Sequence, residues 1–121
     1  MAITKVLVVD DSLTDLTNIK NIVTDAGCLV FTASNGVEAF DKAKAEKPDV
    51  IFLDIVMPDQ DGFGTCRKLA ASSETKDIPV VFVSSKNQKA DRIWAQMQGA
   101  KGYVVKPYTA QEIVDQLKAL A

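Results

Sequence analysis

The chain of 121 residues contains no histidine, which excludes histidine-based metal sites, histidine general bases and a role as a phosphohistidine carrier. Its two cysteines, Cys28 and Cys66, lie far apart among apolar neighbours, so we expect two reduced thiols in the core. No apolar run approaches the length of a membrane span, and the apolar stretch at 6–9 is too short for a signal peptide. We therefore expect a cytoplasmic protein.

Neither sign of charge is in large excess, because 14 basic residues face 16 acidic ones and the net charge is −2. This balance gives no electrostatic reason to expect nucleic acid or a membrane surface as the main partner. Apolar residues make up 47% of the chain, which is enough for a core of ordinary size. The sequence contains no repeat, linker or low-complexity segment. We expect one domain over residues 1–121 with no attached output domain.

Short apolar segments alternate with segments of helical periodicity along the whole chain. The apolar segments predict strands at 5–9, 28–33, 50–54, 79–85 and 102–106. A helix is expected after each strand. The first is marked by Ser12 as N-cap, with Asp15 three residues on and Gly27 as the stop. Asn35-Gly36 predicts a turn. Trp94 lies on the apolar face of the fourth helix, which favours packing in the core or at its edge over a contact with a partner.

The strands do not alternate between apolar and polar residues, so both faces of the sheet should be covered. Strict alternation of strands and helices, with right-handed crossovers, predicts an open parallel α/β sheet with helices on both sides. In such sheets, ligand sites form at the carboxyl ends of the strands.

The residues at those strand ends form a distinctive group. They are Asp10 and Asp11 after the first strand, Asp54 at the end of the third, Ser84 near the end of the fourth and Lys106 at the end of the fifth. Two carboxylates about 5 Å apart repel by roughly 3 kcal/mol at an effective dielectric constant near 20. Lys106 supplies only one compensating charge, so we expect Mg²⁺ at this edge of the sheet. A single aspartate there would more simply be a helix cap, but all five groups together favour a site.

Four segments, "VLVVDDS", "DVIFLDIVMPDQDGF", "PVVFVSS" and "GYVVKPY", resemble the signature blocks of response regulator receiver domains of two-component systems. The resemblance covers the whole chain. It implies a flavodoxin-like sheet of order 2-1-3-4-5 with five helices on its two faces. The segment "KNQKADRIWAQMQGAKGY" is also similar to receivers of chemotaxis-like systems that control type IV pili and twitching motility.

The resemblance implies a role for each residue at the strand ends. Asp54 would accept a phosphoryl group from a phosphohistidine of a sensor histidine kinase or phosphotransfer protein. Asp11, Asp54 and the main-chain carbonyl of Val56 would ligate Mg²⁺ directly, and Asp10 would act through water. The remaining implied residues are Ser84 and Lys106, which would hold phosphoryl oxygens.

The family also suggests how such a domain passes on a signal. Tyr103 is either a packed strand aromatic or the family's switch residue, and the sequence does not choose between them. A downstream protein target would bind the face made by the fourth helix, fifth strand and fifth helix. Lys106-Pro107 matches a position where the family's peptide bond is cis, although X-Pro bonds are mostly trans.

Other functions on the same fold leave different patterns. A flavin or nucleotide carrier needs a loop rich in Gly, Ser and Thr after the first strand, whereas this chain has "DDSLTD". A phosphatase with an aspartate nucleophile commonly has a second carboxylate two residues later, where this chain has Val56. We therefore expect a stand-alone phosphorylation switch and not an enzyme. A phosphate sink or a relay intermediate stays open as an alternative.

Overall fold

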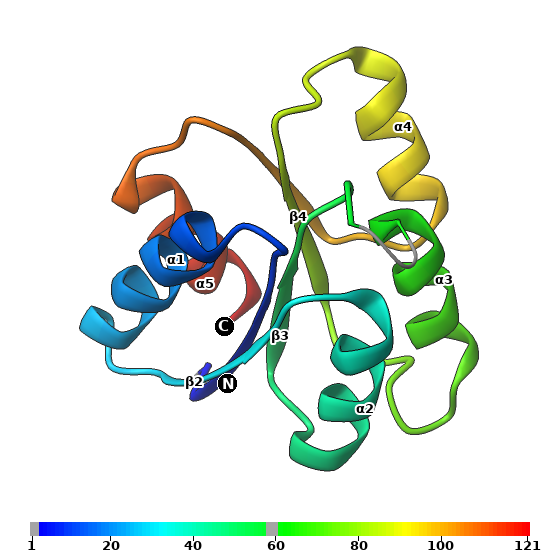
Figure 1. The fold of residues 1–121 in the computed structure, drawn as a ribbon, viewed down its shortest axis with the longest axis horizontal. Coiled ribbons are helices and arrows are strands. Elements are labelled where there is room, and N and C mark those ends of the chain that lie inside the picture. Colours follow the sequence, from blue (N-terminus) through cyan, green and yellow to red (C-terminus); the bar gives the residue numbers. More distant parts are fainter. Residues whose placement is uncertain (1–2, 58–60) are drawn as a thin grey trace.

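The computed structural model describes residues 3–57 and 61–121, which form a parallel sheet covered by helices on both faces (Figure 1). Residues 58–60, inside the "DVIFLDIVMPDQDGF" segment, lie outside the described residues. The strands run in the order β2-β1-β3-β4-β5, as predicted. They are β1 (Lys5–Val9), β2 (Leu29–Ala33), β3 (Val50–Leu53), β4 (Val80–Ser84) and β5 (Gly102–Val105).

One helix follows each strand in the described part of the chain. The helices are α1 (Leu13–Asp25), α2 (Gly36–Glu46), α3 (Gly62–Ala71), α4 (Lys89–Met97) and α5 (Ala110–Leu120). Helices α1 and α5 pack on one face of the sheet, and α2, α3 and α4 pack on the other (Figure 1). None of these helices has the length and apolar character needed to span a bilayer.

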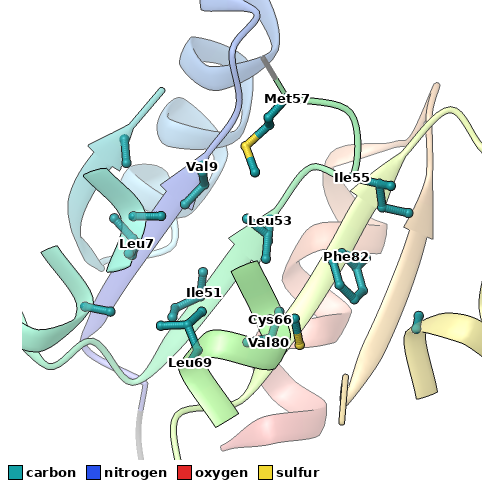
Figure 2. Close-up of a cluster of buried hydrophobic side chains, with 14 residues drawn as sticks. Leu7, Val9, Ile51, Leu53, Ile55, Met57, Cys66, Leu69, Val80 and Phe82 are labelled. Carbon is teal, nitrogen blue, oxygen red and sulfur yellow. The ribbon is translucent and has the colours of Figure 1, made fainter. Parts of the chain in front are cut away.

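Two buried clusters fill the spaces between the sheet and its helices. The first contains Leu7, Ile51 and Phe82 of the strands with Leu69 and other residues of α2, α3 and α4 (Figure 2). The second contains Val8 and Phe52 with side chains from α1 and α5. Consecutive residues of a strand therefore enter opposite clusters, which explains why the strands are apolar throughout. Both thiols are free; Cys66 is buried and Cys28 half-buried.

Side chains of the N-cap residues accept hydrogen bonds from main-chain amides of the first helical turn. Ser12 is the N-cap of α1, and its hydroxyl accepts from the amide of Asp15 at 3.4 Å. Gly27 follows α1 at φ +93°, a conformation that favours glycine. The Asn35-Gly36 pair does not form a separate turn. Instead, Asn35 is the N-cap of α2 and Gly36 is its first residue.

The prediction that Trp94 packs in the core or at its edge is wrong. Trp94, Met97 and Ile93 are 52%, 69% and 47% exposed, and Ala95 is the residue of α4 that is buried against the sheet. The helical spacing correctly identified one apolar face. However, spacing does not tell which face of a helix meets the sheet, and here the small Ala95 allows close packing while the larger side chains face outward.

Candidate functional site

The sheet itself places the predicted site residues at one edge. Val9 pairs with Leu53 in the register, so the next residues, Asp10 and Asp54, are neighbours. The amide of Asp54 donates to the carbonyl of Val9 at 3.0 Å. Where β4 pairs with β5, the amide of Lys106 donates to the carbonyl of Ser84 at 2.9 Å. Main-chain pairing therefore fixes the Cα positions of these residues, as the strand-end argument predicted.

Three carboxylates converge at this edge. One oxygen from each of Asp10, Asp11 and Asp54 lies within 4.8 Å of the other two. Asp10 and Asp54 are buried, whereas Asp11 is exposed. Carboxylate oxygens at such spacing suit a hard divalent cation such as Mg²⁺, which binds through one or two carboxylates and keeps several waters. The donor set thus fits the predicted metal.

Lys106 is the cation of the cluster. Its Nζ lies 2.8 Å from Asp10 Oδ2 and 4.0 Å from Asp54 Oδ1. Burial disfavours the charged ammonium, but hydrogen bonds to Asp10 and Asp15 outweigh burial and raise the pKa of Lys106. The lysine is therefore charged at neutral pH and lies within reach of a group added to Asp54. The Lys106-Pro107 peptide bond is cis, as in the family that the sequence resembles.

Asp54 is held in an unfavourable electrostatic environment. Burial, followed by the charge of Asp10, raises its pKa to about 6, and Lys106 offsets only part of this effect. One oxygen, Oδ1, accepts a hydrogen bond from the amide of Ile55 at 2.8 Å. The chain after β3 comes very close to this residue, because any side chain at Gly62 would collide with the main-chain carbonyl of Asp54. Gly62 is thus required for the local path of the backbone.

The two predicted switch residues meet at the start of the β4–α4 connection. Ser84 is fully buried, and its Oγ accepts a hydrogen bond from the amide of Lys86 at 3.3 Å. The Tyr103 hydroxyl donates to the carbonyl of the same Lys86 at 2.6 Å. The Tyr103 ring is half-buried, and its centroid lies 6.4 Å from the centroid of the Phe82 ring. The guanidinium of Arg92 lies 5.2 Å from the centroid of the Tyr103 ring. Both readings of Tyr103 therefore have a physical basis.

Val56 and Asp15 are two further residues near the strand ends. The Val56 side chain is 57% exposed beside the cluster, and the role of its carbonyl as a metal ligand stays a prediction. Sequence reasoning missed Asp15, whose Oδ2 lies 3.0 Å from Lys106 Nζ. Its position in the first turn of α1 suggested only a partner for the Ser12 cap, so no sequence signal distinguished these roles.

Two bacterial proteins are similar to the chain over nearly its whole length. It is 37% identical to protein PilH of Pseudomonas aeruginosa over 96% of both chains. It is also 36% identical to protein PilG of that organism, over 95% of this chain and 85% of PilG. These two relatives support the narrower resemblance to receivers of pilus-related, chemotaxis-like systems.

Solved structures and a family model agree with these relatives. Chemotaxis protein CheY4 of Vibrio cholerae superposes with a TM-score of 0.93 at 31% identity, covering 99% of this chain and all of CheY4. The model of the response regulator receiver domain matches residues 6–118. Such domains are two-component signalling proteins and not enzymes in the usual sense. The chain therefore belongs to the response regulator receiver domain family.

Proposed function

We propose that this receiver domain is a switch in which Asp54 accepts a phosphoryl group from a phosphohistidine of a sensor histidine kinase or phosphotransfer protein. The observation that carries the proposal is the position of Asp54. It is a buried carboxylate of raised pKa, 4.0 Å from a lysine ammonium and next to two further carboxylates. Burial of such a charge is costly unless the group is compensated or does chemistry.

The transfer exchanges one bond to phosphorus for another. A carboxylate oxygen of Asp54 attacks phosphorus, a P–O bond forms, the P–N bond to the donor imidazole breaks, and the bonding electron pair stays on that nitrogen. Enzymes and receivers contribute to such transfers mainly through positioning and charge neutralisation. Lys106 would bind one phosphoryl oxygen, and the hydroxyl of Ser84 would donate to another. Asp54 must be ionised to attack, a condition that its pKa of about 6 meets at neutral pH.

Receiver domains bind Mg²⁺ at an acidic pocket, and the present cluster has the donors for it. We assign Asp11, Asp54 and the carbonyl of Val56 as direct ligands and Asp10 as a residue that acts through water. When bound, the metal would neutralise charge on the carboxylates and on the phosphoryl oxygens. This neutralisation would also relieve the repulsion between Asp10 and Asp54.

The signal would leave the site through Ser84 and Tyr103. Both residues bond to Lys86, so movement of the Ser84 hydroxyl toward a phosphoryl oxygen would disturb the contact that holds the Tyr103 hydroxyl. The face made by α4, β5 and α5 would respond to this movement. The exposed side chains of Ile93, Trp94 and Met97 on α4 give this face the apolar surface that a protein partner needs.

Two versions of this function differ in what happens to the phosphoryl group. In the first, the phosphorylated domain acts alone and binds a downstream protein, which the relatives PilH and PilG suggest belongs to a motility system. In the second, the domain is a phosphate sink or a relay intermediate. The exposed apolar residues of α4 favour the first version, because a sink needs no output surface.

Mapping of the modified residue tests the proposal. The protein is incubated with acetyl phosphate and Mg²⁺, the acyl phosphate is reduced with borohydride, and the labelled residue is identified by mass spectrometry. We expect Asp54 to be labelled, the Asp54→Asn variant to be unlabelled, and an Asp41→Asn control to behave like wild type. Labelling of another residue in the wild type, or equal labelling of Asp54→Asn, would refute the proposal.

A further inference from the structure

Lys106 has a partner that its proposed role does not require. The Asp15 carboxylate of α1 lies 3.0 Å from Lys106 Nζ, nearly as close as the 2.8 Å contact with Asp10. An ammonium group has three hydrogen-bond donors, and these two carboxylates occupy two of them. Asp54 Oδ1, at 4.0 Å, is the most distant of the three acidic neighbours.

Local structure turns Asp15 toward the lysine. In a complete capping box, the third residue of the helix would bond back to the amide of the cap residue. Here the amide of Ser12 donates to Asp10 Oδ1 at 2.9 Å instead. The Asp15 side chain is thus available to reach Lys106. One turn further along α1, the side-chain Nδ2 of Asn18 donates to the Tyr108 hydroxyl at 3.1 Å. Two polar contacts therefore join α1 to the segment after β5.

The three carboxylates around Lys106 differ in how easily water could replace the lysine. The side chains of Asp10 and Asp54 are 2% and 9% exposed, whereas that of Asp15 is 38% exposed. A cavity of about 420 Å³ opens at this position, lined by Asp15, Asn18, Ser85, Lys106, Pro107 and Tyr108. Because Asp15 borders water, it is the contact that Lys106 can give up at the lowest cost in free energy.

We propose that Asp15 is a positioning residue that holds Lys106 while Asp54 is unmodified and competes with the phosphoryl group for it. This inference rests on the proposed function of Asp54. A phosphoryl group adds negative charge on the Asp54 side of the ammonium. Lys106 then leaves Asp15 for the phosphoryl oxygen, and water hydrates the released carboxylate. Formation of the modified state therefore includes the loss of one ion pair between α1 and the end of β5.

Beryllofluoride with Mg²⁺, a mimic of the phosphoryl group, tests this competition. We would titrate it into wild type, Asp15→Asn, Asp15→Glu and the charge-matched control Asp41→Asn, whose mutated side chain is exposed on α2. Asp15→Asn should bind roughly two- to fivefold more tightly, the range expected for a half-exposed ion pair. Asp15→Glu restores a carboxylate and should bind like wild type, as should Asp41→Asn.

A spectroscopic readout separates loss of the ion pair from a general effect of charge. The side-chain ammonium signal of Lys106 is followed by NMR and assigned by its absence in Lys106→Arg. Asp15→Asn should shift this signal in the free protein and leave it unchanged in the beryllofluoride complex. An equal shift in both states, or an affinity of Asp15→Asn no tighter than that of Asp41→Asn, would overturn the role of Asp15. Failure of the wild type to bind beryllofluoride would instead overturn the proposed function, and this inference with it.

Discussion

The two ends of β3 each have an aspartate, and the protein treats the two carboxylates in opposite ways. Asp49 precedes the strand, and its Oδ2 accepts hydrogen bonds of 2.9 Å from the amides of Thr4 and Lys5 and from the Thr4 hydroxyl. These bonds lower the pKa of Asp49. Asp54 follows the strand, where burial and the charge of Asp10 raise its pKa to about 6.

The difference separates a carboxylate that stabilises the fold from one that the fold tolerates. At the amino-terminal end of the sheet, main-chain donors match the charge of Asp49, and the ion joins β1 to β3. At the carboxyl-terminal end, the cluster of Asp10, Asp11 and Asp54 lies beside one lysine, Lys106, which Asp15 also contacts, so negative charge is in excess. The first arrangement contributes to stability without a ligand, whereas the second is compensated only in part by Lys106 until a metal cation is bound.

Replacement of Asp54 should produce the largest change in stability. In the absence of metal and at neutral pH, Asp54→Asn should raise the free energy of unfolding by about 1 to 3 kcal/mol. The upper limit is the free-energy equivalent of the pKa shift of Asp54 from 3.8 to about 6. The asparagine oxygen can still accept from the amide of Ile55. Denaturant unfolding with a chelator gives the value, and a destabilised variant would contradict the electrostatic account.

Replacement of Asp49 should have the opposite sign and a smaller size. Asp49→Ala leaves three donors of residues 4 and 5 without their acceptor, and we expect a loss of about 1 to 2 kcal/mol, since these groups remain accessible to water. Asp41→Ala, at an exposed position of α2, is the control for loss of a surface carboxylate. Equal unfolding free energies for the two variants would mean that Asp49 does not stabilise the strand end.

The dependence of stability on pH should distinguish the two ends further. The folded pKa of Asp54 lies above its unfolded value, so its contribution is present below pH about 4 and is lost as the pH rises to about 6. The folded pKa of Asp49 is lowered, so its contribution is lost as the pH falls through the acid range. Without metal, wild type should therefore lose stability relative to Asp54→Asn by about 1 kcal/mol per pH unit between these values. A constant difference would refute the assignment.

Much of this molecule could be predicted from its sequence because the main chain places the important groups. The meeting of Asp10, Asp54, Ser84 and Lys106 follows from parallel pairing, which needs only the positions of the strand ends. The strand order was predicted from the resemblance to receiver domains and not from the strand positions. Side chains that choose among several partners could not be predicted. Asp15 could have bonded back to the amide of Ser12, but Asp10 accepts that hydrogen bond and Asp15 accepts one from Lys106.

The orientation of α4 was unpredictable for a related reason. Its apolar residues recur at helical spacing, which is also the pattern of a helix buried against a core. Ala95 is a small side chain that carries little weight in such a pattern, yet it is the residue that packs against the sheet. An exposed apolar face and a buried one have the same periodicity, and only packing distinguishes them. The face left exposed is the one that we assign to output.

The most direct test of the central claim compares the effect of Mg²⁺ on wild type and Asp54→Asn. The claim is that Asp54 destabilises the metal-free fold and that a cation compensates it. The free energy of unfolding is measured for both proteins with chelator and with millimolar Mg²⁺. We predict that Mg²⁺ stabilises wild type markedly and Asp54→Asn much less, so that the advantage of the variant shrinks. Equal stabilisation of both proteins by Mg²⁺, or no advantage of Asp54→Asn in chelator, would contradict the account.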